Sequence, residues 1–266
     1  MSLSCHRHTG PTLRIVNVVI GGISKGETHL MSKHILAASA GLAIDDGIWR
    51  LGPIMRYGLQ LTGKPSPRLC YIGTAGGDDA TWTRAFYSAC FGEDVTPSHL
   101  QLFTMPNVRD VRAHLLAQDM LWVGGGSVAN LLAVWRAHSL DAILREAWER
   151  GVVLAGVSAG SICWHVGGTT DSFGVELRPV TNGLGFLPYS NGVHYDSEER
   201  RRPLFQKLIA EGTLPEGYAT DDGVALHYVG ETLHKVVADT SGKYAYHVVR
   251  TSTGVEETSI EPEALG

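Results

Sequence analysis

The feature that most restricts the fold is an alternation of short apolar runs with longer amphipathic runs from residue 33 onward. The short runs predict β-strands at 34–39, 68–73, 99–104, 119–123 and 151–157. The longer runs predict helices near 51–62, 80–91, 107–117, 127–137 and 139–150, the last with apolar residues at positions i, i+3, i+4 and i+7. Strands that alternate with helices build βαβ units. We therefore expect an α/β fold with a mostly parallel sheet and helices on both of its faces.

The C-terminal part of the chain has a different pattern, because its apolar runs are short and separated by turns. These runs, 224–228, 233–238 and 244–249, predict strands that form an antiparallel edge on the same sheet. Residues 1–30 are polar and rich in turn-forming residues, and we interpret them as a weakly packed N-terminal extension. No linker or internal repeat divides the remainder. The sequence therefore predicts a single α/β domain over 31–250 and a C-terminal tail over 251–266.

The composition argues against several classes of protein. The 266-residue chain has a net charge of −5 and scattered Lys and Arg residues, which offers no basic surface for nucleic acid. It lacks an uninterrupted apolar run of about 18 residues and a clear signal-peptide cleavage site, so we expect no membrane partner. The four cysteines form no CxxC pair, which is typical of free thiols in a reducing cytoplasm. No metal-ligand spacing such as HExxH occurs. We expect a cytoplasmic protein without a metal or an organic cofactor.

The stretch GVSAG, residues 156–160, fits the pattern G-x-S-x-G and lies between a predicted strand and an apolar helical start. In this context the pattern indicates a nucleophile elbow. A tight turn would push Ser158 into the cleft beyond the carboxyl end of the strand, at a helix N-terminus that favours negative charge. The flanking glycines leave room for neighbouring backbone. The alternative interpretation is a serine that only caps the helix.

A serine nucleophile needs a base, and His194 has the most suitable position among the twelve histidines. It follows a short apolar segment and precedes a predicted helix, where a loop can bring an imidazole to the carboxyl edge of the sheet. A carboxylate must then orient that imidazole. Asp171, Asp222 and Glu176 are all candidates, and spacing along the chain does not choose among them.

The segment LWVGGGSVANLL contains a candidate oxyanion hole. Its three consecutive glycines at a strand end expose backbone N–H groups, which can act together with the Ala159 N–H. The same segment fits the dinucleotide-binding pattern G-x-G-x-x-A through Gly124, Gly126 and Ala129. That interpretation needs an acidic residue at the end of the next strand, and the chain has none there. Nucleotide binding is therefore the weaker hypothesis.

In order and spacing, the segments VGGGSVANLL, GVSAGSICW, TTDS and HYDSEERR resemble the peptidase E family, also called dipeptidase E or aspartyl dipeptidase, and its cyanophycinase relatives. The resemblance extends from about residue 33 to about residue 247. It implies a three-layer fold of the class I glutamine amidotransferase-like, flavodoxin-like type. It also implies the activity of a serine peptidase that requires no cofactor.

The resemblance also implies roles for individual residues of a catalytic triad. Ser158 matches the nucleophile and His194 matches the base. Asp171 matches the third member, and the position of Asp222 also suits an acid in that role.

The glycine segment can be compared with the family in the same way. Gly125 and Gly126 match residues that hold the oxyanion, next to the Ala159 N–H. Ser127 stands where peptidase E carries Asn, so we expect an altered polar contact with the substrate.

We therefore expect hydrolysis of small peptides through an acyl-enzyme, with Asp-X dipeptides as one candidate substrate class. A serine at the elbow argues against ammonia transfer from glutamine, because that chemistry relies on a thiolate. A substrate carboxylate could pair with an arginine of the 200–202 cluster, although nearby glutamates also explain these arginines.

Two alternatives from other functional classes remain. One is a catalytically inactive protein of the same fold that binds a small molecule, and the other is a nucleotide-binding protein. The expected partner is a small peptide substrate, and a homodimer is left open as an assembly state.

Overall fold

The computed structural model describes residues 32–265. The predicted N-terminal extension, residues 1–30, lies outside the described residues. Within 32–265, no helix has the length and apolar character needed to cross a membrane.

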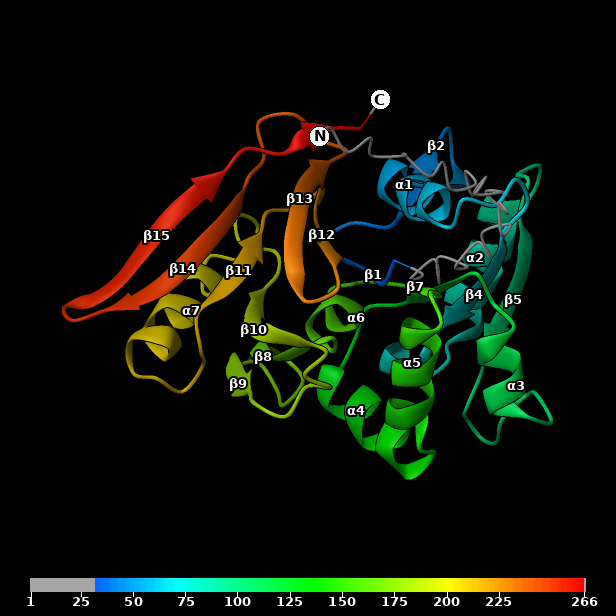
Figure 1. Cartoon of the computed structure of the whole chain (residues 1–266), viewed down its shortest axis with the longest axis horizontal. Coiled ribbons are helices and arrows are strands. Elements are labelled where there is room, and N and C mark those ends of the chain that lie inside the picture. Colours follow the sequence, from blue (N-terminus) through cyan, green and yellow to red (C-terminus); the bar gives the residue numbers. More distant parts are fainter. Residues whose placement is uncertain (1–31, 266) are drawn as a thin grey trace, which may run out of the picture. The chain divides into compact units, whose positions relative to one another are not determined.

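An eight-stranded sheet forms the centre of the fold (Figure 1). Its five parallel strands are neighbours, while β12 pairs antiparallel with β1, β13 pairs antiparallel with β12, and β16 adds to β13. In spatial order the strands are β16 (Glu263–Ala264), β13 (Thr232–Ala238), β12 (Val224–Val229), β1 (His34–Ala38), β7 (Val153–Val157), β6 (Met120–Val123), β4 (Arg68–Ile72) and β5 (Thr96–Leu100).

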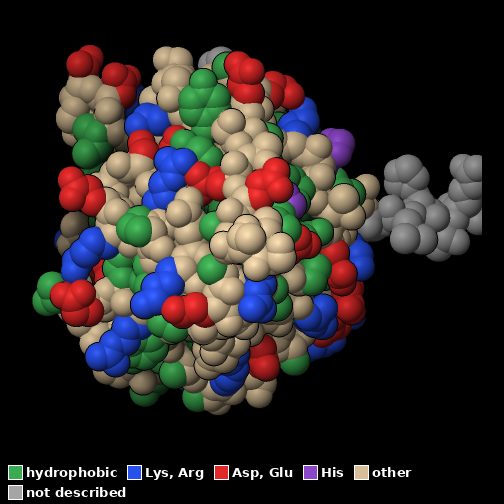
Figure 2. Space-filling model, turned by 90° about the vertical axis from the view of Figure 1, so that its left-hand side faces the viewer, with side chains coloured by type: hydrophobic (Ala, Val, Ile, Leu, Met, Phe, Trp, Pro, Cys, Tyr) green, Lys and Arg blue, Asp and Glu red, His purple; other side chains and the backbone are tan. Residues whose placement is uncertain are grey.

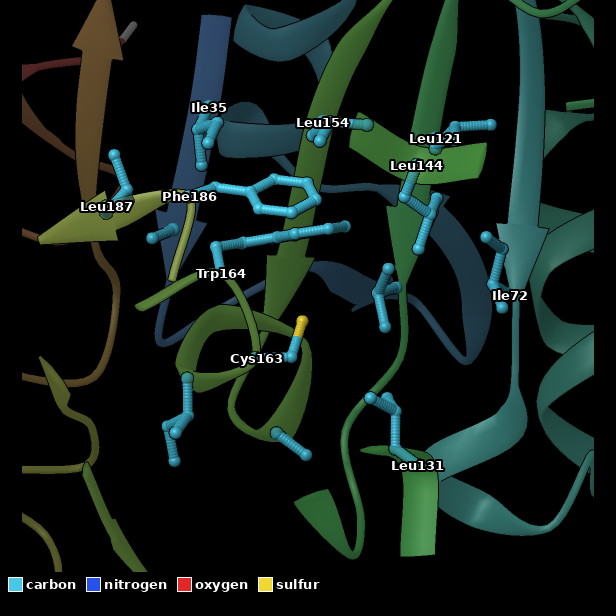
Figure 3. Packing of buried hydrophobic residues seen from close by; sticks show 14 of the residues in the cluster. Ile35, Ile72, Leu121, Leu131, Leu144, Leu154, Cys163, Trp164, Phe186 and Leu187 are labelled. Carbon is cyan, nitrogen blue, oxygen red and sulfur yellow. The ribbon is translucent and has the colours of Figure 1, made fainter. Parts of the chain in front are cut away.

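Side chains of the parallel strands alternate between the two faces of this sheet, as the pleat requires. Ile35 and Leu121 belong to one buried cluster, which Figure 3 shows from close by. Their neighbours Leu36 and Trp122 belong to a second buried cluster on the other face. Both faces are therefore covered, which explains why the strand sequences are almost continuously apolar.

Helices form the two outer layers. The cluster that contains Ile35 includes residues of α3 (Val111–Leu116), α4 (Val128–Ala137) and α5 (Leu140–Glu149). The cluster that contains Leu36 includes residues of α1 (Pro53–Leu61) and α2 (Ala80–Cys90). Local sequence fixes several helix starts, since Asp79, Asp110 and Ser127 each cap a helix and Pro53 opens α1. The predicted α/β fold with helices on both faces is confirmed.

The C-terminal part differs from the prediction of one sheet, because it contributes strands to a second, six-stranded sheet. In spatial order its strands are β15 (Gly254–Ile260), β14 (Ala245–Thr251), β11 (Gly217–Thr220), β10 (Leu187–Gly192), β8 (His165–Thr170) and β9 (Arg178–Val180). Helix α7 (Arg201–Ala210) packs on this sheet through Phe205 and Ile209. Two shorter elements, η1 (Thr74–Gly76) and α6 (Ala159–Ile162), follow strands β4 and β7 of the central sheet.

The expected tail over 251–266 also differs from the structure. Residues 254–260 form β15, which pairs antiparallel with β14 along its whole length. The sequence GVEETSI is polar because this strand lies at an edge of the sheet and half of its side chains face solvent. Figure 2 shows the side of the molecule that faces left in Figure 1, where acidic and basic side chains are interspersed.

A further hairpin, β2 (Leu42–Asp45) and β3 (Ile48–Leu51), was not predicted. Its turn places Asp46 and Gly47 at φ of 46° and 76°. Such a turn, formed by Asp-Gly between alternating apolar residues, is the local signal of a two-residue hairpin.

Two buried histidines predict how stability depends on pH. Burial lowers the pKa of His165 to about 4, and burial together with His34, His234 and Lys235 lowers the pKa of His227 to about 3. Below its ordinary pKa of about 6.5, an unfolded histidine binds a proton that the folded form excludes. The free energy of unfolding should therefore fall as the pH drops from about 6.5 toward about 4, by up to about 1.4 kcal/mol per pH unit for each group.

Urea unfolding of the wild type, His165→Gln and His227→Gln at pH values from 7 to 5 measures this dependence. Each variant should lose about 1 kcal/mol per pH unit of the wild-type slope. Slopes that match the wild type in both variants would contradict the account, whatever the absolute stabilities are.

Candidate active site

Ser158 lies at the turn between β7 and α6 in a strained backbone conformation. Its φ is 57° and its ψ is −113°. A residue other than glycine pays of order 1–3 kcal/mol for such a conformation, which persists only where the surroundings enforce it. The Ser158 N–H donates to Ala38 O at 3.0 Å, and its carbonyl accepts from the N–H groups of Ser161 and Ile162. The turn therefore has the geometry of a nucleophile elbow.

The two glycines that flank Ser158 are required by close backbone packing. A Cβ atom on Gly156 would lie 2.4 Å from Gly160 O, and one on Gly160 would lie 2.3 Å from Val123 O. Both distances are shorter than any van der Waals contact, and the obstructing atoms belong to backbone that cannot rotate away. The pattern G-x-S-x-G thus reflects the packing of the elbow against β6.

His194 and Asp222 follow neighbouring parallel strands of the second sheet. Strands β10 and β11 pair in parallel, with Gly192 opposite Ala219, so the segments that follow them leave the sheet side by side. His194 Nδ1 lies 2.5 Å from Asp222 Oδ1. The hydrogen bond from His194 is the largest cause that holds the pKa of the Asp222 carboxyl below its ordinary value. With Nδ1 donating to a carboxylate, Nε2 is the imidazole nitrogen left to accept a proton.

Ser39 joins the strand beside Ser158 to the His194 segment. It directly follows β1, whose Ala38 accepts the hydrogen bond from the Ser158 N–H. The Ser39 hydroxyl lies 2.7 Å from Thr220 Oγ1 and accepts from the His194 N–H at 3.4 Å. Ser39 is buried, with 5% of its surface exposed. This side chain therefore links the two sheets at the site.

The glycine segment after β6 lies against Ser158. A Cβ atom on Gly125 would be 3.4 Å from Ser158 Cβ and 3.9 Å from its Oγ. Within residues 32–265, the N–H groups of Gly125, Gly126 and Ala159 have no hydrogen-bond acceptor. Backbone N–H groups left open beside a serine hydroxyl are suited to bind an oxyanion.

Ser158, His194, Gly125 and Gly126 line one pocket of about 790 Å³. This volume lies within the range of roughly 300–1,000 Å³ that is usual for small-ligand sites. The opposite part of the lining is aromatic and aliphatic, and includes Trp49, Trp82 and Trp122.

Some residues expected at the site lie elsewhere. The Asp171 side chain is 63% exposed, and its Oδ1 lies 4.0 Å from Arg201 Nη2. The carboxylate that contacts His194 is that of Asp222. The Ser127 hydroxyl accepts from the N–H of Asn130 and caps α4, and Ser127 does not line the pocket.

The remaining charged candidates also lie outside the pocket lining. Each arginine of the cluster pairs with a carboxylate: Arg200 with Glu176, Arg201 with Glu198, and Arg202 with Glu257. Among the described residues, no group of three or more His, Cys, Asp or Glu side chains is arranged to hold a metal ion.

Comparisons with known proteins agree with this geometry. Residues 35–236 match Peptidase family S51. A relative from Bacillus subtilis strain 168, "Uncharacterized peptidase YgaJ", is 42% identical over 213 residues, which covers 79% of this chain and 90% of that protein. Peptidase E of Shewanella denitrificans is 25% identical over 189 residues, or 66% of this chain and 75% of that protein.

A solved structure has the same fold. The crystal structure of a peptidase from an acI-B1 Actinobacterium superposes with a TM-score of 0.62 at 16% identity, covering 88% of this chain and 96% of the other. The expected relationship to the peptidase E family is thereby confirmed. The chain belongs to peptidase family S51 and is a serine peptidase.

Proposed function

We propose that the chain hydrolyses small peptides by acyl transfer, with Ser158 as nucleophile, His194 as general base and Asp222 as the group that orients the imidazole. The observation that carries the proposal is the hydrogen bond of 2.5 Å between His194 and Asp222, beside a pocket that His194 shares with the strained Ser158. The three residue types and their order of contact suit a Ser–His–Asp triad.

In the first half of the reaction, Ser158 Oγ attacks the carbonyl carbon of the scissile amide, while His194 Nε2 takes the hydroxyl proton. Asp222, held ionised by its lowered pKa, stabilises the imidazolium that results. The tetrahedral intermediate then expels the amine, to which His194 returns the proton. This leaves the acyl group on Ser158 as an ester.

In the second half, water attacks the ester while His194 again acts as the base, and the carboxylic acid leaves. In both halves the N–H groups of Gly125, Gly126 and Ala159 stabilise the oxyanion, each worth about 3 kcal/mol. Gly125 lies beside Ser158, which supports this role over nucleotide binding by the same segment. No step requires a metal or an organic cofactor.

The nucleophile is tested by Ser158→Ala, with Ser88→Ala as a control because Ser88 is exposed on α2. Turnover of a dipeptide library should fall by roughly 10⁴-fold or more in Ser158→Ala and remain at the wild-type level in Ser88→Ala. Thermal unfolding should show that both variants fold. Appreciable peptide hydrolysis by folded Ser158→Ala would contradict the proposal.

The orienting acid is tested by comparing Asp222→Asn with Asp171→Asn. An amide at 222 cannot hold Nδ1 as a donor to a carboxylate, so kcat should fall by roughly 100-fold or more in Asp222→Asn. Asp171→Asn should change kcat by less than about threefold, because that side chain is largely exposed and contacts Arg201. The reverse order of effects would assign the role to Asp171.

Ser39 should act on catalysis as a positioning residue. In Ser39→Ala the Thr220 hydroxyl and the His194 N–H both lose their partner. We expect kcat to fall by roughly 10–100-fold with little change in KM, because a small displacement of His194 affects proton transfer more than binding. Ser39→Thr, which retains the hydroxyl, should recover part of this loss. An unchanged kcat in Ser39→Ala would show that the link does not position His194.

A further inference from the structure

The walls of the pocket that face away from the glycine segment are apolar. Trp49 of β3, Trp82 of α2 and Trp122 of β6 line it, with Leu42 and Ile44 of β2. The Trp49 and Trp82 rings meet edge to face, with their centroids 5.7 Å apart. Of the described residues that line the pocket, none is Lys, Arg, Asp or Glu. The lining therefore offers a large aromatic surface and no counter-ion.

The apolar lining continues to the rim. Trp82 is 48% exposed and Ile44 is 62% exposed, although each contributes to the pocket. Apolar side chains that remain open to solvent beside a concave site are typical of a surface that a ligand covers. An apolar group bound between them would remove apolar surface of both the protein and the ligand from water.

The electrostatic surroundings disfavour a carboxylate in the same place. Tyr71 lines the pocket, and burial followed by the negative charges of Asp78 and Asp79 raises the pKa of its hydroxyl to about 12. An aspartate side chain entering this pocket would lose hydration without gaining a cationic partner, and it would lie near these acidic residues. The arginines at 200–202, which could have supplied such a partner, pair with other carboxylates outside the pocket lining.

We propose that this pocket takes an aromatic or large aliphatic side chain next to the scissile amide, and that the preferred substrates are small apolar peptides rather than Asp-X dipeptides. The proposal rests on the proposed function, because it uses the same Ser158 and His194. Trp82 is then a residue that determines specificity. It has no part in proton transfer, since its side chain belongs to the wall of the pocket.

Binding can be measured without chemistry in the Ser158→Ala variant. Isothermal titration of this variant with Phe-Ala, Ala-Phe, Asp-Ala and Ala-Ala compares the side chains directly. The better phenylalanine dipeptide should bind about tenfold or more tightly than Asp-Ala and Ala-Ala, because it buries a large apolar side chain. Asp-Ala binding as tightly as the phenylalanine dipeptides would overturn the proposal.

A second pair of variants tests the wall itself. Ser158→Ala combined with Trp82→Ala should lose most of the preference for phenylalanine, roughly tenfold. The matched control combines Ser158→Ala with Phe91→Ala, which removes an aromatic side chain 85% exposed at the end of the same helix and outside the pocket lining. This control should keep the preference. An equal preference in both double variants would overturn the assignment of Trp82.

Wild-type turnover separates this proposal from the proposed function. Hydrolysis of Phe-Ala or Ala-Phe with a kcat/KM at least tenfold above that of Asp-Ala supports both. Hydrolysis of Asp-Ala in preference overturns the apolar specificity and leaves the peptidase mechanism standing. Preferential binding of phenylalanine dipeptides without any hydrolysis by the wild type overturns the mechanism and retains the apolar pocket.

Discussion

Two hydrogen bonds at the carboxyl end of β1 hold the candidate active site together. Ala38 O accepts from the Ser158 N–H at 3.0 Å, and the adjacent Ser39 hydroxyl lies 2.7 Å from Thr220 Oγ1. The first bond fixes the elbow within the eight-stranded sheet, and the second joins that sheet to β11 of the six-stranded sheet. Ser158 comes from one sheet, whereas His194 and Asp222 come from the other. Their relative positions therefore depend on how the two sheets meet, rather than on the conformation of a single loop.

The strain at the elbow is supported by burial on both sides of it. The strained conformation of Ser158 costs of order 1–3 kcal/mol. Before it, Leu154 of β7 is fully buried, and after it Trp164 is fully buried as well. Trp164 packs against Phe186 with their ring centroids 5.9 Å apart (Figure 3). Because each such side chain contributes about 1.5–3 kcal/mol when buried, the flanking core outweighs the strain and keeps the serine in place.

Local signals predicted the features that local sequence determines. The spacing of apolar residues identified the parallel strands, and two flanking glycines identified the elbow at Ser158. The choice of Asp222 over Asp171 depends on which strand lies beside β10, and such long-range pairing leaves no trace in spacing along the chain. The second sheet was missed for the same reason. The hairpin that carries Trp49 had a readable signal in its Asp-Gly turn, but the adjoining helix pattern obscured it. The extent of residues 1–30, the cytoplasmic location and the homodimer stay predictions.

The central claim is that His194 activates Ser158, and the rate of fluorophosphonate labelling measures this activation most directly. The reagent modifies a serine that a neighbouring base has made nucleophilic, and mass spectrometry of the digested protein locates the adduct. The account predicts that the wild type is labelled at Ser158 and that labelling is lost in His194→Ala. A wild type that remains unlabelled, or a His194→Ala variant that is labelled at the wild-type rate, would contradict it.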